Sequence, residues 1–138
     1  DYGHGTGHGV GYFLNVHEGP QSIAVAAVPQ PHHAMKSGML TSNEPGLYRP
    51  GKWGIRIESL VINRPVEKPE ETEFGKFLYF ETVTLCPIDT RLIDTKLMTG
   101  SEIEWLNQYH AEVRRRLEPL TEGAAKAWLI ERTEPLAR

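Results

Sequence analysis

The pattern of apolar and polar positions changes character once along this chain. Residues 1–86 carry short alternating or apolar runs separated by glycine and proline, which is typical of β-strands joined by turns. Residues 99–132 instead repeat apolar side chains at helical spacing. We therefore expect one α+β unit in which strands come first and helices last, rather than two separate domains.

Four runs in the first part of the chain predict strands. Each is rich in apolar or β-branched residues, and glycine or proline lies close to its ends. The third run is the strongest prediction, because its apolar and polar positions alternate. The four runs are residues 22–28, 39–44, 53–63 and 77–86.

The second and third runs are expected to form a hairpin. Two strong turn signals, Pro45-Gly46 and Pro50-Gly51, lie between them and predict a rather long loop. A period of two in the third run puts Arg56 and Glu58 on one face of the strand. The hairpin would also bring Glu44 level with Glu58 on the neighbouring strand.

The second part of the chain predicts two helices. Thr99 and Glu102 have the spacing of a capping box, in which Thr99 is the N-cap and Glu102 lies at the third helical position. The first helix should end near Pro119, and the second should run from Glu122 to Arg132. The side chains expected on the inner faces of these helices are Trp105, Leu106, Tyr109, Val113, Ala125, Trp128 and Leu129.

Cys86 and His110 are expected to have no catalytic or metal-binding role. Cys86 lies on an apolar run and is expected to be a small buried side chain. It is the chain's one cysteine, so an internal disulfide is excluded. His110 has no histidine or carboxylate at ligand spacing, and we expect it at the surface.

Composition narrows the class of protein. With 138 residues, 39% hydrophobic residues and a net charge of −3, the chain can bury a core and has no basic patch. No apolar run approaches the length of about 18 to 20 residues that crosses a membrane. We therefore expect binding neither to nucleic acid nor to membranes. The first residue is Asp1 rather than Met, directly before a glycine-histidine motif, so we expect a piece of a longer protein.

Three residues point to metal chemistry. His8 lies within a run of alternating glycines, Glu44 precedes Pro45-Gly46, and Glu58 ends the alternating third run. One imidazole and two carboxylates form a ligand set that suits a divalent cation used for hydrolysis. Glycines beside a histidine let the backbone pass close to a ligand without a Cβ clash.

Simpler interpretations stay open at this point. The glycine-rich run could be a solvated terminus, and Glu44 and Glu58 could be exposed strand carboxylates. Arg56 could neutralise Glu58 as a structural ion pair, since a carboxylate on an apolar strand needs a cation or polar partners. The first interpretation is weakened by the apolar alternation that follows the glycines and leads to His17.

Six segments together resemble one known family. They are GHGTGHGVGYFLNVHEGP from residue 3, TSNEPGLY from residue 41, GIRIES from residue 54, VTLCPIDTRLID from residue 83, EWLNQYH from residue 104 and AWLIERTEPL from residue 127. In combination they resemble the Xaa-Pro aminopeptidases (aminopeptidase P) of the long-chain cytosolic type. These are pita-bread metallopeptidases, a group that includes prolidase, creatinase and methionine aminopeptidase.

The resemblance covers the whole chain and implies its fold. Residues 1–138 would be the C-terminal fragment of a metallopeptidase catalytic domain. The fold would be the C-terminal half of a pita-bread (creatinase/aminopeptidase) fold, with a curved, mainly antiparallel sheet and helices on its outer face.

The resemblance also implies the metal ligands. His8 matches the metal-binding histidine of the family, and Glu44 and Glu58 match its two metal-binding glutamates, with Glu58 bridging two ions. Those ions are commonly Mn²⁺, with Zn²⁺ or Co²⁺ as alternatives. The family uses two further aspartates that lie before the first histidine motif, so we expect residues 1–138 alone to bind metal weakly and to be almost inactive.

Further roles follow from the same resemblance. His4 and His17 match histidines that contact the substrate and stabilise its reacting carbonyl, and Glu44 would also transfer a proton. Tyr48 and Arg56 match residues that surround the ligands.

The implied substrate is a peptide with proline in second position, cleaved before the proline, in a cytoplasmic enzyme that forms a homodimer. Two alternatives are a prolidase-type dipeptidase and a non-catalytic pita-bread module for binding or assembly. Such modules typically lose metal ligands, so the presence of His8, Glu44 and Glu58 favours an enzyme.

Overall fold

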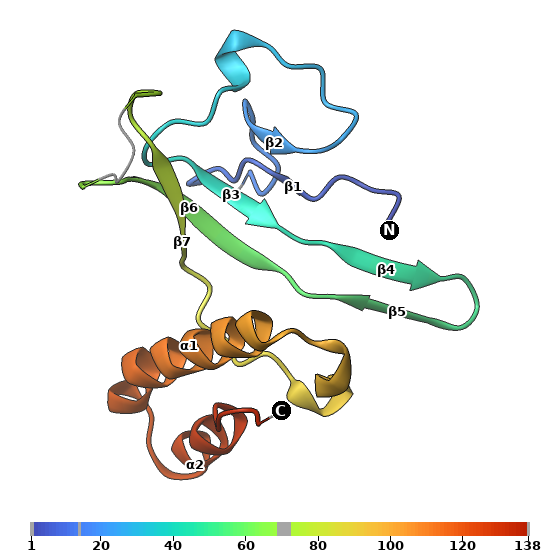
Figure 1. The fold of residues 1–138 in the computed structure, drawn as a ribbon, viewed down its shortest axis with the longest axis vertical. Coiled ribbons are helices and arrows are strands. Elements are labelled where there is room, and N and C mark those ends of the chain that lie inside the picture. The colour runs from blue at the N-terminus through green and yellow to red at the C-terminus, as the bar shows by residue number, and fades with distance from the viewer. Residues whose placement is uncertain (1, 14, 69–72, 138) are drawn as a thin grey trace. The chain divides into compact units, whose positions relative to one another are not determined.

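A computed structural model describes residues 2–13, 15–68 and 73–137. The chain divides into two compact units, Asp1–Thr84 and Leu85–Arg138 (Figure 1). The boundary lies where the sequence changes from strand-like to helix-like patterns. The first unit contains β1 (Gly7–His8), β2 (Ser22–Ile23), β3 (Leu40–Asn43), β4 (Gly46–Arg49), β5 (Trp53–Arg56), β6 (Ser59–Pro65), β7 (Leu78–Thr82) and a 3-10 turn at Pro31–His33.

All strand pairs of the first unit are antiparallel. β6 lies between β3 and β7, β4 pairs with β5, and β1 pairs with β2. Figure 1 shows β4 and β5 continuing the line of β3 and β6 as one long hairpin. Gly51, at the tip of this hairpin, has a φ of 71°, which glycine adopts without the steric cost that other residues meet. The predicted hairpin is confirmed, but the rather long loop expected in it is wrong, because Gly46–Arg49 forms β4 and pairs with β5.

The register of the long hairpin is unbroken, although its pairing is interrupted. Asn43 pairs with Ser59 on one side of the interruption, and Gly46 pairs with Arg56 on the other. Two residues on each strand separate these pairs, so neither strand gains or loses a position. Counting along both strands places Glu44 opposite Glu58, as the sequence predicts.

The glycine-rich run lies antiparallel along β3. Glu44 donates from its backbone N–H to the Thr6 carbonyl at 2.7 Å, and Val10 donates to Leu40 at 3.0 Å. The approach is close at Gly7, where an added Cβ would lie 1.8 Å from the carbonyl oxygen of Ser42. Glycine at position 7 is therefore a steric requirement of this contact.

Three strand predictions are wrong in their extent. The run 22–28 forms a strand only at Ser22–Ile23, and beyond it Val25 and Val28 are exposed to solvent, with no strand of the described residues paired to them. The run 53–63 is divided at Ile57–Glu58 into β5 and β6. The run 77–86 ends as a strand at Thr82.

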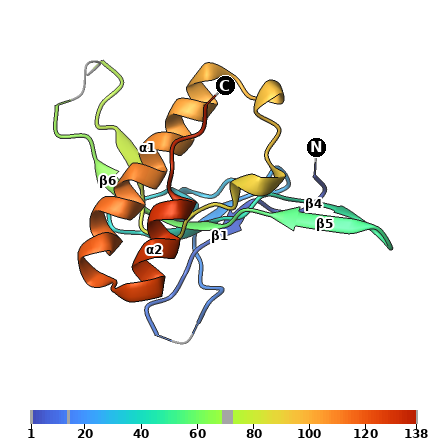
Figure 2. The ribbon, with the colours of Figure 1, turned by 90° about the horizontal axis from the view of Figure 1, so that it is seen from below.

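The second unit is helical, as expected. It contains α1 (Gly100–Leu117), α2 (Gly123–Arg132) and 3-10 turns at Thr90–Leu92, Thr95–Leu97 and Glu118–Leu120. Figure 2 shows α1 and α2 side by side. The predicted capping box is present, because the Thr99 hydroxyl accepts from the Glu102 N–H and the Glu102 carboxylate accepts from the Thr99 N–H. None of the helices formed by the described residues is long and apolar enough to cross a membrane.

The buried stripe of α1 agrees with the prediction at Leu106 and Val113 but not at Trp105 and Tyr109. Ile103, Leu106, His110 and Val113 are buried, whereas Trp105 is 57% exposed. On α2 only Leu129 is buried, and Trp128 and Ala125 are exposed. Cys86 is exposed too.

His110 is fully buried, against expectation, because its Nε2 atom accepts a hydrogen bond from the Ile88 N–H at 3.1 Å. That bond offsets part of the cost of burying a polar ring.

Candidate metal centre

His8 and Glu44 come together although they lie far apart in the sequence. The Nε2 atom of His8 is 3.2 Å from the Oε1 atom of Glu44. β1 carries the histidine, and the glutamate follows the last residue of β3. The antiparallel alignment of the glycine-rich run along β3 brings the two side chains to the same place. Both are largely shielded from solvent, with side-chain exposures of 24% and 13%.

The protons on His8 can be assigned from its contacts. Its Nδ1 atom lies 2.8 Å from the Gly9 carbonyl oxygen, which can only accept, so Nδ1 carries a proton. In the neutral ring Nε2 is then an unprotonated acceptor, and it faces a carboxylate oxygen that is also an acceptor. Two facing acceptors repel one another unless a proton or a metal cation lies between them. A proton on Nε2 would make the contact an ion pair, and a metal cation held by both atoms would fit the same separation.

The two oxygens of Glu44 have different partners. Oε1 accepts from the Ser42 hydroxyl at 3.1 Å and also faces His8, while Oε2 accepts from Nη1 of Arg56. Arg56 in turn donates from Nε to the Tyr48 hydroxyl at 2.6 Å. That hydrogen bond, followed by the negative charges of Glu44 and Glu58, raises the pKa of the Arg56 guanidinium, while partial desolvation opposes the rise. Arg56 is thus a permanent cation that fixes one oxygen of Glu44.

Glu58 lies near the contact between His8 and Glu44 in the hairpin but is not part of it. The hairpin register puts its backbone opposite Glu44. Among residues 2–13, 15–68 and 73–137, no group of three or more histidine, cysteine or acidic side chains has the geometry to hold a metal ion. The described structure therefore presents a pair of candidate ligands, His8 and Glu44, and a third carboxylate whose backbone lies opposite Glu44 in the hairpin.

The chemistry of this pair suits a divalent metal. Ligand bonds of about 2.1 Å at a right angle put two donor atoms about 3 Å apart, close to the separation between His8 and Glu44. A histidine whose Nδ1–H is held by a carbonyl presents Nε2 in the tautomer that metal binding requires. His8 and Glu44 are the residues that could hold an ion here.

The other two predicted histidines, His4 and His17, contact different residues. The rings of His17 and His8 have centroids 4.1 Å apart. The ring of His4 lies 5.9 Å from that of Tyr48, between centroids. The structure thus brings His17 to the candidate ligands and His4 to Tyr48.

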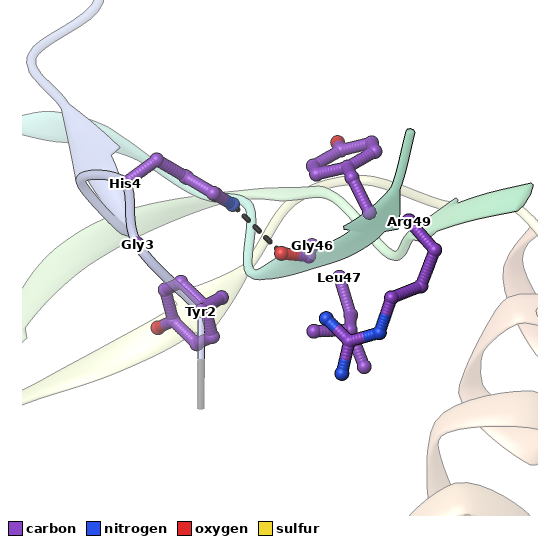
Figure 3. Close-up of a pocket in the computed structure, with 7 residues that line it drawn as sticks. Tyr2, Gly3, His4, Gly46, Leu47 and Arg49 are labelled. Carbon is purple, nitrogen blue, oxygen red and sulfur yellow. Dashed lines mark hydrogen bonds between the residues drawn. The ribbon is translucent and has the colours of Figure 1, made fainter. Parts of the chain in front are cut away.

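A pocket of about 310 Å³ opens beside His4 (Figure 3). Nε2 of His4 lies 2.9 Å from the Gly46 carbonyl, and Nδ1 lies 2.7 Å from the Gly5 carbonyl. A neutral imidazole carries one N–H and can donate to only one of these oxygens. The ring would have to release the Gly46 carbonyl before it could donate to a substrate. The pocket is lined by Tyr2, Gly3, His4, Gly46, Leu47, Tyr48 and Arg49.

Two residues of this site were missed by the sequence interpretation. Ser42 contacts both His8 and Glu44, and Gly7 allows the close approach of the two segments. A signal for Ser42 was present, because it lies two positions before Glu44 on a strand and a period of two puts both on one face. The need for glycine at position 7 could not be seen without the alignment to β3.

Residues 1–64 match the model of metallopeptidase family M24, and residues 76–136 match the model of the C-terminal region of peptidase M24. With the ligand geometry above, these matches define the class: the chain belongs to metallopeptidase family M24.

The names of similar proteins indicate a narrower group within this family. The chain is 50% identical over 138 residues to a probable Xaa-Pro aminopeptidase P of Coprinopsis cinerea, a match that covers 99% of this chain and 22% of that protein. It is 47% identical over 139 residues to aminopeptidase P2 of Arabidopsis thaliana, covering 100% of this chain and 19% of that protein.

A solved structure gives the same result for the fold. The crystal structure of X-prolyl aminopeptidase from Caenorhabditis elegans, a cytosolic enzyme with a di-nuclear active site, matches with a TM-score of 0.84 at 38% identity. The match covers 99% of this chain and 22% of that one. The expected pita-bread assignment is thereby confirmed. The chain spans about a fifth of the length of these relatives.

Proposed function

We propose that this chain is the C-terminal part of the catalytic domain of an Xaa-Pro aminopeptidase, which hydrolyses the peptide bond before a proline in second position. The contact between Nε2 of His8 and Oε1 of Glu44 carries the proposal. It provides two ligand atoms at a separation that suits one cation. The names of the relatives from Coprinopsis cinerea and Arabidopsis thaliana support the substrate class.

We assign the ligands as His8, Glu44 and Glu58, and the metal as Mn²⁺ in a site of two ions. When bound, such ions lower the pKa of water and stabilise negative charge on the reacting carbonyl. Glu58 lies opposite Glu44 in the hairpin register, so a side-chain rotation rather than a backbone shift would complete the set. The di-nuclear active site of the Caenorhabditis elegans enzyme supports this assignment.

The remaining residues act on protons and on the substrate. Glu44 takes a proton from the nucleophile and passes it towards the leaving proline nitrogen. His17, whose ring lies against that of His8, and His4, beside the pocket, stabilise charge on the carbonyl oxygen. Arg56 and Tyr48 keep Glu44 in position through their hydrogen bonds. A cytosolic location and a homodimer complete the proposal, the former supported by the cytosolic relative.

The test uses the natural protein that contains this chain, with Mn²⁺ as the added metal. We expect cleavage of Ala-Pro-Ala after its first residue and little cleavage of Ala-Ala-Ala. His8→Gln and Glu44→Gln should each lower kcat/KM by about 100-fold or more, since loss of a metal ligand costs at least as much as loss of its supporting residue. The control is His32→Gln, because His32 is exposed.

Two results would change the assignment. Preference for the dipeptide Ala-Pro over Ala-Pro-Ala would identify a prolidase-type dipeptidase. Absence of both hydrolysis and Mn²⁺ binding in the natural protein would identify a non-catalytic module. Residues 1–138 alone should be almost inactive, because their described part offers a pair of ligands and not a complete metal cage.

A further inference from the structure

Ser42 is a buried polar residue whose hydroxyl connects the two candidate ligands. Its side chain belongs to β3, and the residue is 1% exposed. The Oγ atom accepts a hydrogen bond from the backbone N–H of His8 at 3.0 Å. The same atom lies 3.1 Å from Oε1 of Glu44 and donates to it. One hydroxyl therefore contacts the backbone that carries the imidazole and the carboxylate that faces it.

The direction of these two bonds follows from what each group can offer. The His8 N–H can only donate, so it occupies a lone pair of the Ser42 oxygen. The hydroxyl proton can go to Oε1 of Glu44 at 3.1 Å or to the His8 carbonyl at 3.5 Å. The shorter contact to a carboxylate is the stronger one. Ser42 thus donates to Glu44 while it accepts from His8.

This arrangement selects which part of Glu44 is left for a cation. Arg56 occupies Oε2, and Ser42 occupies one lone pair of Oε1. The remaining lone pair of Oε1 lies on the side of His8 Nε2, 3.2 Å away. The hydroxyl is held in turn by the close approach of the chain at Gly7, which has no Cβ to separate it from Ser42.

We propose that Ser42 is a positioning residue of the metal centre, which sets the orientation of Glu44 relative to His8 through its hydroxyl. The inference rests on the proposed function, because it assumes that His8 and Glu44 share a cation. Ser42 acts through Glu44, whose carboxylate it holds in one orientation, so Glu44 loses less side-chain entropy when the ion binds.

The test compares two residues of nearly equal shape at position 42. Ser42→Thr keeps the hydroxyl and adds a methyl group, whereas Ser42→Val adds the same methyl group and replaces the hydroxyl by another, so the two variants differ only in the hydrogen-bonding atom. Ser42→Ala is the third variant. The matched control is Thr41→Val, because Thr41 is also buried and its hydroxyl accepts from Gln21 instead.

The readout is the affinity for Mn²⁺ alone, measured by titration calorimetry on the natural protein that contains this chain, with circular dichroism to verify folding. Ser42→Ala and Ser42→Val should weaken Mn²⁺ binding by about 10- to 100-fold, the range for residues that support metal ligands. Ser42→Thr and Thr41→Val should bind within about threefold of the unaltered protein. The kcat at saturating Mn²⁺ should fall less than the affinity.

Each outcome decides the question. Equal Mn²⁺ affinities for Ser42→Val, Ser42→Thr and Thr41→Val would overturn the proposal. Unfolding of both hydroxyl-free variants in the presence of Mn²⁺, while Thr41→Val folds, would also overturn it by making Ser42 a residue of folding. If the unaltered protein neither binds Mn²⁺ nor cleaves Ala-Pro-Ala, the proposed function fails first, and the role of Ser42 falls with it.

Discussion

Arg56 donates a hydrogen bond from Nε to the hydroxyl of Tyr48 at 2.6 Å, and the same guanidinium is bonded through Nη1 to Glu44. The planar group thereby connects two strands of one hairpin, since Tyr48 lies on β4 and Arg56 on β5. Its centre lies 5.6 Å from the middle of the Tyr48 ring, within the range of a cation–π contact. These contacts depend on the shape of the guanidinium as well as on its charge.

The first prediction concerns that shape. Arg56→Lys keeps a positive charge but replaces a planar fork by one ammonium group, which cannot hold Tyr48 and Glu44 in the same geometry. We expect kcat/KM for Ala-Pro-Ala to fall by about 10-fold or more. Tyr48→Phe, which leaves the contact between Arg56 and Glu44 intact, should cost less. If the lysine variant equalled the unaltered protein, charge alone would be sufficient.

The second prediction concerns Gly7. Gly7→Ala places a methyl group 1.8 Å from the Ser42 carbonyl oxygen, so the glycine-rich run must move away from β3. Overpacking of this kind costs about 1–3 kcal/mol of unfolding free energy. Gly3→Ala is the matched control, because nothing lies within 4 Å of a Cβ at that position. Equal urea midpoints for both variants would contradict the close approach.

The third prediction concerns the pH dependence of stability. Burial, followed by the positive charge of Arg114, lowers the pKa of His110 below its ordinary value of 6.5. The unfolded chain therefore binds a proton more readily than the folded one. Stability from the neutral ring is fully present above about pH 6.5 and declines as the pH falls towards the lower folded pKa.

His110→Gln should remove this decline between about pH 7 and pH 5, because glutamine does not titrate. The exposed His32→Gln is the control. Hydrogen bonds from Arg91 hold the pKa of Asp89 well below its usual range. Such carboxylates are protonated, and their contribution to the stability of the fold is lost, only at lower pH. Urea unfolding curves at several pH values would separate the two windows. An unchanged slope in His110→Gln would show that other groups cause the loss.

The fourth prediction concerns the capping box of α1. Thr99→Ala removes the hydroxyl that accepts from the Glu102 N–H and should cost about 1 kcal/mol of unfolding free energy. Glu122→Ala tests the N-cap of α2, where the side chain makes no capping bond, and should have a much smaller effect. Thermal unfolding followed by circular dichroism measures both. Equal shifts in Tm would contradict the role assigned to Thr99.

Features formed within a few residues of the sequence were predicted correctly, and features that depend on a neighbouring strand or helix were not. The capping box at Thr99 could be predicted because both of its bonds lie within four residues. The strand at 22–28 could not be bounded, because an apolar run forms a strand only where a neighbour pairs with it. The helical period of α1 was correct, but it does not say which side the neighbouring helix covers. The stripe through Leu106 and His110 is therefore buried, while Trp105 is exposed.

The candidate site shows the same division. The sequence predicted that the hairpin would bring Glu44 level with Glu58, since the turn at Pro50-Gly51 and the strand period determine that count. The other turn signal, Pro45-Gly46, lies where β4 begins. It could not predict that His8 would lie against Glu44, because this depends on the alignment of a glycine-rich run with β3. The residue types first suggested the three ligands as a set, and the resemblance to a family supported it. The position of Ser42 emerged only from the coordinates.

The unbroken register of the long hairpin fixes the positions of Glu44 and Glu58 relative to one another. One residue inserted into or deleted from β4 or β5 has to be absorbed as a local bulge, or every later side chain on that strand turns to the opposite face. In the second case Glu58 would point away from Glu44. The turn at Gly51 lies between β4 and β5, so residues added at the tip of the hairpin would leave Glu44 opposite Glu58.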